Sequence, residues 1–168
     1  GNTKAALSML ERIHAKWPGN MDVSEELCSI RLDDVRHMME LAQYDEAIAL
    51  LEKLRGFKVD SDTKNIVERR LFTCYVKTGQ RQKALQQLKN ITKDAETSAQ
   101  LYEEIMLPYI KQLMNQGRLY QSVSEIQKIL DMGHPSADAL LMGINIYMQL
   151  KNNDKARRLA DIGKERFP

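Results

Sequence analysis

Apolar residues recur along the chain at intervals of three and four positions, which is the spacing of an α-helix. The pattern is clearest over residues 71–91, where an apolar stripe precedes Gly79 and a second stripe follows it. The two stripes are Leu71, Phe72, Tyr75 and Val76, then Ala84, Leu85, Leu88 and Ile91. Gly79 stands where a helix commonly ends on a left-handed residue. The segment therefore predicts a helix, a tight turn and a returning helix.

The same pattern recurs along nearly the whole chain. One isolated helix is expected first, followed by four helical hairpins whose connections contain polar residues, Gly or Pro. The predicted units are a half unit at 4–18 and hairpins at about 22–56, 61–92, 98–132 and 136–167. A single hairpin leaves apolar surface uncovered, so the hairpins are expected to stack in one array.

The second helices align on a small residue near their start. These residues are Ala6, Ala47, Ala84, Ser122 and Ala156, which are 41, 37, 38 and 34 positions apart. A period of this length is typical of helical-hairpin repeats.

The chain resembles the tetratricopeptide repeat family in these residues. QYDEAIALLEKL, from Gln43, looks like the start of that family's second helix, and Tyr75 and Tyr147 match its first-helix aromatic. Trp17-Pro18 and Phe167-Pro168 match its closing proline. The resemblance implies an all-α fold, an α-solenoid with a right-handed superhelix. Three of the four spacings exceed the 34 residues usual in the family, so a less regular superhelix is expected.

Two features depart from a regular array. The first unit supplies only its second helix, and no polar capping helix follows the last hairpin, so we expect a fragment of a longer protein. Pro108 falls inside a predicted first helix, where it removes a backbone donor and crowds the preceding turn. The sequence predicts either a kink or a break into two shorter helices there.

Composition and motifs point away from catalysis. The chain is 43% hydrophobic and 29% charged with a net charge of +2, and these values give no global reason to expect nucleic acid. Cys28 and Cys74 fall within apolar-periodic helices and are predicted to be buried thiols. The three histidines share no ligand spacing, and neither a phosphate-binding glycine loop nor a nucleophile motif is present. We therefore expect no enzyme, no metal and no cofactor. The sequence leaves the location of this soluble chain open between the cytoplasm and the periplasm.

The resemblance implies where a partner would bind, because first helices line the concave groove in that family. The corresponding polar positions are Arg36, Glu40, Arg69, Thr73, Lys77, Glu104, Lys111, Asn115, Asn145 and Gln149. The expected partner is a protein or peptide. Arg69, Lys77 and Lys111 favour an acidic segment or a terminal carboxylate, although a merely solvated polar face fits the same residues.

Two other functions fit an array of this kind. One is the periplasmic repeat region of a bacterial exopolysaccharide export protein, which recruits modifying enzymes or contacts the polymer. The other is RNA binding, which needs basic and stacking residues repeated along one face. The predicted groove mixes Glu with Lys and Arg and contains few aromatics, which disfavours RNA.

Overall fold

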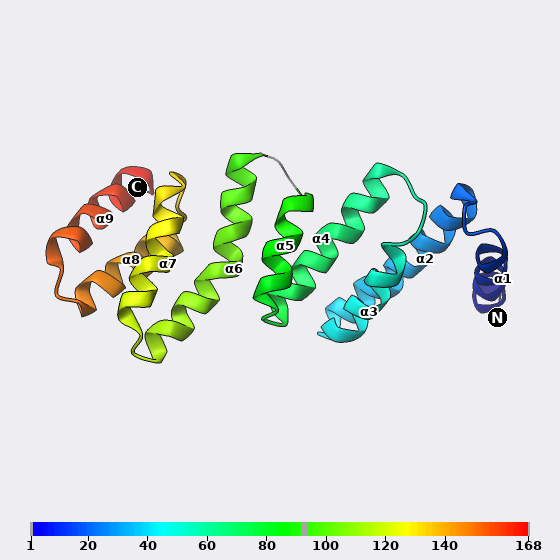
Figure 1. Ribbon diagram of the computed structural model, residues 1–168, viewed down its shortest axis with the longest axis horizontal. Coiled ribbons are helices and arrows are strands. Elements are labelled where there is room, and N and C mark those ends of the chain that lie inside the picture. The colour runs from blue at the N-terminus through cyan, green and yellow to red at the C-terminus, as the bar shows by residue number, and fades with distance from the viewer. Residues whose placement is uncertain (1, 92–93, 168) are drawn as a thin grey trace. The chain divides into compact units, whose positions relative to one another are not determined.

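The computed structural model describes residues 2–91 and 94–167, and every regular element in these ranges is an α-helix (Figure 1). The chain divides into two compact units, residues 1–91 and 92–168. The first unit contains α1 (Asn2–Lys16), α2 (Met21–Glu40), α3 (Tyr44–Leu54), α4 (Ser61–Lys77) and α5 (Arg81–Ile91). The second contains α6 (Ala95–Asn115), α7 (Leu119–Asp131), α8 (Ala137–Gln149) and α9 (Asn153–Arg166). The chain is thus an all-α repeat of helical hairpins, as its periodicity predicts.

Each unit is built from two hairpins. In the first, α2 pairs with α3 and α4 pairs with α5, while α1 packs against α2. In the second, α6 pairs with α7 and α8 pairs with α9. Consecutive hairpins join when the returning helix meets the next first helix, α3 on α4 and α7 on α8. The first helices also meet, α2 with α4 and α6 with α8, so each unit has one face made by two first helices. Thr92, which ends one of the predicted units, and Pro168, the last predicted closing proline, lie outside the described residues.

All four hairpins turn in the same way. Each first helix is followed by a residue with positive φ, at Ala42 (58°), Gly79 (70°), Gly117 (71°) and Lys151 (56°). The next amide then donates back five residues; for example, Gln80 N donates to Tyr75 O at 2.9 Å and Asn152 N to Tyr147 O at 2.8 Å. This is the hydrogen-bond pattern of a Schellman cap. The repeat is therefore present in the backbone as well as in the side chains.

The small residue of each returning helix lies where two helices approach. Ala47, Ala84 and Ser122 are fully buried, and Ala156 is buried as well. Ser122 is tolerated there because its hydroxyl donates to the Arg118 carbonyl at 3.1 Å. Ala6 in α1 is exposed.

Tyr75 and Tyr147 occupy equivalent places in α4 and α8. Each buried tyrosine donates its hydroxyl to the preceding returning helix, Tyr75 to Glu52 at 2.7 Å and Tyr147 to Gln127 at 2.9 Å. A lysine of its own hairpin covers the ring, Lys83 at 5.3 Å and Lys155 at 5.2 Å from the ring centroid. Each tyrosine therefore ties its hairpin to the previous one, which explains the aromatic in the repeat pattern.

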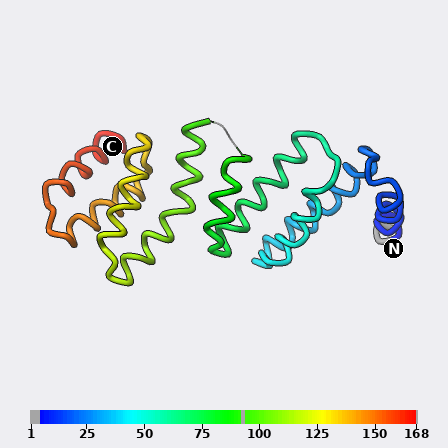
Figure 2. Tube along the Cα trace, viewed as in Figure 1, coloured from blue at the N-terminus to red at the C-terminus, as the bar shows by residue number. Residues whose placement is uncertain are grey.

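Pro108 lies within a single helix, α6, so the predicted alternative of a break into two helices is wrong. The two halves of α6 run in different directions in Figures 1 and 2, which is the expected kink. The proline nitrogen has no hydrogen to donate, so the Glu104 carbonyl, four residues earlier, lacks its usual helical partner.

Candidate functional site

The face formed by α6 and α8 carries a groove of about 720 Å³. Its walls combine apolar and polar side chains from both helices. They are Leu107, Pro108, Lys111, Met114 and Asn115 of α6, and Asp138, Leu141, Met142, Asn145 and Gln149 of α8. Four of the predicted partner-binding residues, Lys111, Asn115, Asn145 and Gln149, are thus brought into one groove. Their role in binding remains a prediction.

The two walls of this groove correspond at four positions. At each of them the α8 residue lies 34 positions after its α6 counterpart, so Leu107 matches Leu141 and Lys111 matches Asn145. Asn115 likewise matches Gln149, one turn further along. The groove therefore consists of successive layers, apolar first, then Lys with an amide, then two amides.

The floor of the groove is apolar and accessible. Leu141 is 62% exposed although it is a large aliphatic residue in the middle of α8. Leu107, Met114 and Met142 are half-buried beside it. Asn145 accepts a hydrogen bond from Gln149 at 3.0 Å, which orders the two amides along the rim. Apolar surface edged by amides is the usual chemistry of a site that holds another molecule.

Glu104 lies in a second hollow of about 720 Å³, which continues the groove and shares Leu107, Pro108 and Asp138 with it. Here the walls are α6, the loop before α8 and the end of α9. The hollow is lined by Glu96, Gln100, Glu103, Glu104, Leu107, Pro108, His134, Pro135, Ser136, Asp138, Arg166 and Phe167. Glu103 is buried and accepts from both the backbone amide and the hydroxyl of Ser136, whose oxygen caps α8. Glu103 therefore positions the start of α8, whereas Glu104 is exposed.

The first unit presents a different surface on α2 and α4. Arg36, Glu40, Arg69 and Lys77 are exposed, and Thr73 is half-buried. Three of these have internal partners. Arg36 lies 3.2 Å from an oxygen of Asp33, Glu40 lies 3.6 Å from a ring nitrogen of His37, and the Thr73 hydroxyl donates to the Arg69 carbonyl at 3.1 Å. The exposed pair of Arg36 and Asp33 contributes little to stability. On α4, the exposed charged residues of this set are therefore both cations, Arg69 and Lys77.

Arg70 is a functional candidate that the sequence pattern did not single out. It is half-buried between α4 and α2, where it donates to the Leu32 carbonyl. Burial, and then the nearby charge of Arg36, lower its pKa below the usual value. The Asp33 carboxylate, which pairs with Arg36, acts on the pKa of Arg70 in the opposite direction and offsets part of this positive charge.

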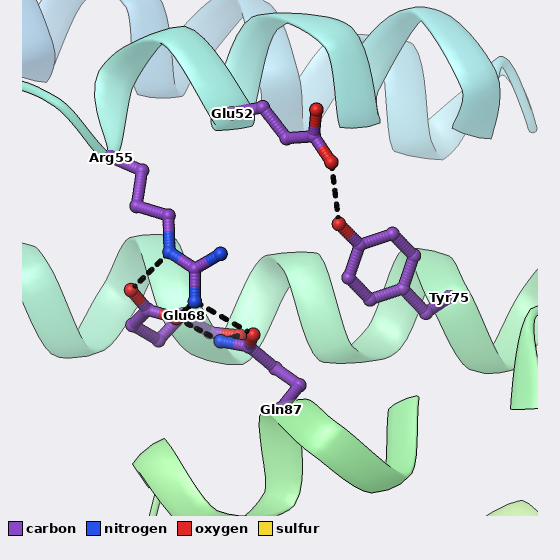
Figure 3. Close-up of polar contacts among 5 residues, drawn as sticks. All are labelled: Glu52, Arg55, Glu68, Tyr75 and Gln87. Carbon is purple, nitrogen blue, oxygen red and sulfur yellow. Dashed lines mark hydrogen bonds and ion pairs between the residues drawn. The ribbon is translucent and has the colours of Figure 1, made fainter. Parts of the chain in front are cut away.

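A buried polar cluster joins α3, α4 and α5 (Figure 3). Arg55 donates to both carboxylate oxygens of Glu68, at 2.9 and 3.0 Å, and to the Gln87 carbonyl oxygen at 3.0 Å. The Gln87 amide donates to the same carboxylate. Glu68 and Gln87 are buried, whereas Arg55 retains contact with solvent. All parts of the cluster are engaged with one another, so it locks the hairpins together and offers no open site.

Both cysteines are fully buried, as predicted. Burial raises the pKa of Cys28 and of Cys74 from 9.0 to about 11. At neutral pH both are neutral thiols, which are poor nucleophiles and poor metal ligands. Across residues 2–91 and 94–167, no three His, Cys, Asp or Glu side chains are grouped so that they could hold a metal ion. Among the same residues, no helix is both long and apolar enough to cross a membrane.

Paired antiparallel helices, a repeated Schellman turn and a face of first helices define the class of helical-hairpin repeat proteins. No protein-family model matches the chain, and no curated protein matches it. Among solved structures, it is similar to the MamA RS-1 ArsTM double mutant, with a TM-score of 0.52 and 14% identity over 98% of this chain and 85% of that one.

A second MamA mutant structure gives a TM-score of 0.50 and 14% identity over 96% of this chain and 93% of that one. A third structure, of YrrB, a TPR protein with an unusual peptide-binding site, gives a TM-score of 0.49 and 21% identity over 98% of this chain and 81% of that one. At these identities the likeness concerns the fold. The chain has the fold of a tetratricopeptide-like repeat protein, as its repeat pattern implies.

Proposed function

We propose that this chain is a non-catalytic scaffold that holds segments of partner proteins against the faces formed by its first helices. The observation that carries the proposal is the groove between α6 and α8, where Leu141 is 62% exposed among half-buried apolar neighbours. Covering such a floor with apolar side chains of a partner removes that surface from water, which is favourable at about 25 cal/mol per Å².

The rim of the groove suits a polypeptide backbone. Asn115, Asn145 and Gln149 each present both a donor and an acceptor, as does every peptide unit. Asp138 to Gln149 is a rise of about 16 Å along α8, which matches about five residues of extended chain. The amides are fixed on helices, so a segment binds a surface that needs little reordering.

The first unit supports a complementary proposal, that its α2–α4 surface takes an acidic segment or a terminal carboxylate. Arg36, Arg69 and Lys77 are exposed there, and Arg70 lies beside Arg36. Guanidinium groups bind carboxylates through paired hydrogen bonds, which gives geometry as well as attraction. RNA is less well suited to the α6–α8 groove, because no aromatic ring lines it for a base to stack on.

The α6–α8 proposal is tested by selecting displayed random seven-residue peptides on the intact chain. The selected peptides are then measured against Leu141→Ser and against Ile162→Ser, a matched change at a 40% exposed position of α9 outside the groove. We expect Leu141→Ser to weaken binding about tenfold, since an aliphatic contact is worth about 1.4 kcal/mol, and Ile162→Ser to leave it unchanged. Equal binding to both variants, or no selectable peptide, would overturn the proposal.

The α2–α4 proposal is tested by charge reversal. Arg69→Glu with Lys77→Glu should abolish the binding of acidic peptides, because attraction becomes repulsion, while the temperature of unfolding stays nearly unchanged at these exposed positions. The control is Lys58→Glu with Lys89→Glu, which makes the same charge change at exposed positions off α2 and α4. An equal loss of binding in the control would show that net charge, rather than this surface, attracts the peptide.

A further inference from the structure

Charge is distributed unevenly along the α6–α8 groove. Glu104 and Asp138 form the layer that precedes the apolar one, because they too are 34 positions apart. Both carboxylates are exposed, and neither has an ion pair or a side-chain hydrogen bond within the described residues. Glu96, in the first turn of α6, is also exposed and lines the same hollow. This end of the groove therefore offers three unpaired carboxylates around an open hollow.

A backbone acceptor adds to these carboxylates. Because Pro108 has no amide hydrogen, the Glu104 carbonyl lacks the partner that a helix normally supplies, and both residues line the hollow. A carbonyl that lacks its usual helical donor can accept a hydrogen bond from another donor that reaches it. The Glu104 carbonyl and the side-chain carboxylates are separate groups, and both can accept hydrogen bonds from a bound segment.

The cations near this end leave its carboxylates available. Arg166 lines the hollow, but its guanidinium donates to the Gly133 carbonyl at 2.7 Å. His134 lies in the same wall. Lys111 is two turns beyond Glu104 on α6, a rise of about 10 Å, in the layer that contains Asn145. The groove thus runs from an acceptor-rich end, across an apolar floor, to a Lys and amide end.

We propose that the α6–α8 groove selects a partner segment in which a Lys or Arg is followed or preceded by apolar residues. The basic side chain lies between Glu104 and Asp138 and donates to them and to the Glu104 carbonyl. The neighbouring apolar side chains cover Leu107, Leu141 and Met142. This specificity rests on the proposed function and adds the chemical class of the segment.

The first unit shows that the preference is not a general property of the repeat. Positions are equivalent when they lie equally far before the left-handed turn residue. On that basis α4 has Ile66 where α8 has Asp138, and Arg69 and Arg70 where α8 has Leu141 and Met142. The layer that is apolar in α8 therefore carries cations in α4, and the layer that is acidic in α8 carries an isoleucine in α4. The two faces are built for segments of opposite charge.

The experiment uses the intact chain and two labelled seven-residue probes with amidated ends, one containing Arg beside two Leu and the other Glu in place of Arg. Binding is followed by fluorescence anisotropy into the millimolar range. The variants are Glu104→Gln with Asp138→Asn, the groove variant Leu141→Ser, and the control Asp161→Asn, which neutralises an exposed carboxylate of α9 outside the groove. Unfolding curves verify that each variant folds.

We expect the Arg probe to bind at least tenfold more tightly than the Glu probe. Neutralising Glu104 and Asp138 should weaken the Arg probe about fivefold, as for a pair worth about 1 kcal/mol, and Asp161→Asn should not. Equal binding of the two probes, with both lost in Leu141→Ser, would overturn the charge preference and leave groove binding intact. Binding of the Arg probe that Leu141→Ser does not weaken would overturn both proposals.

Discussion

Single residues at the hairpin turns set part of the stability of this chain. Each turn requires positive φ, a conformation that costs an L-residue with a side chain about 1 kcal/mol. Gly79 and Gly117 meet this requirement, and the sequence marks them plainly as turns. Ala42 and Lys151 adopt the same conformation at φ of 58° and 56°, although neither residue type indicates it. Their turns were predictable only from the repeat.

Ala42→Gly and Lys151→Gly should each raise the free energy of unfolding by about 0.5 kcal/mol, since glycine adopts positive φ without steric strain but loses more entropy on folding. Urea denaturation measures the change. Gly79→Ala, at φ 70°, is the reverse control and should lower stability. A loss of stability in Ala42→Gly would show that this turn is not strained.

Three buried groups make stability fall at alkaline pH. Burial raises the pKa of Cys28 and Cys74 from 9.0 to about 11, and burial, aided by the hydrogen bond to Glu52, raises that of Tyr75 from 10.0 to about 12. The folded state therefore holds these protons more tightly than the unfolded state does. Their contribution is complete below pH 9 and is lost progressively between about pH 9 and 12.

Denaturation midpoints measured from pH 7 to 11.5 should be flat at first and then decline. The decline should be shallower in Tyr75→Phe, measured relative to that variant's own midpoint at pH 7. In the native wild-type chain at pH 8, a thiol reagent should modify both cysteines only as fast as the chain opens. Rapid modification of the cysteines without unfolding, or a denaturation midpoint that increases as the pH is raised above 9, would contradict this burial.

At the scale of elements, the helices follow from sequence periodicity, whereas the polar contacts between them do not. Glu68 lies eleven residues before Gly79, and at the same distance before their turns α6 has Met106 and α8 has Leu140. At the same distance before Ala42, however, α2 has Arg31, so the repeat alone does not decide between an apolar and a charged residue at 68. Its partners Arg55 and Gln87 are 13 and 19 positions away, and only the packing of three helices brings them together. Pro108 is the converse case, because its local chemistry predicts a kink or a break, and the structure shows that the helix continues through it.

Glu68→Ala should lower the free energy of unfolding by about 2–3 kcal/mol, because it leaves Arg55 and Gln87 without their acceptor. The combined change Arg55→Met, Glu68→Leu and Gln87→Leu should recover most of that loss, as Met106 and Leu140 show that apolar residues fit the position. Glu125→Ala, which breaks the more exposed ion pair with Lys128, serves as control and should cost less than about 1 kcal/mol. Chemical denaturation gives all three values. A triple variant with a lower free energy of unfolding than Glu68→Ala would show that the cluster contributes net stability.

At the scale of the whole molecule, the repeat predicts the fold and indicates which helix faces are available for partners. Of the residues predicted to bind, Lys111, Asn115, Asn145 and Gln149 meet in one groove, while Glu104 lies in its continuation. The apolar floor and the acceptor-rich end were not foreseen. Leu141 was not among the residues predicted to bind, and its 62% exposure depends on how α6 and α8 pack. The fold can therefore be predicted from the sequence, whereas the residues proposed to determine specificity are identified only from the structure.

The central claim is that a protein segment occupies the α6–α8 groove, and site-specific photo-crosslinking in the cells that make the protein tests it most directly. A photoreactive phenylalanine derivative replaces Asn145 in the groove or, as control, exposed Arg157 on α9, which does not line it. The account predicts a discrete crosslinked protein from position 145, lost when Leu141→Ser is added, and none from position 157. Crosslinks of equal yield from both positions, or none from position 145, would contradict it.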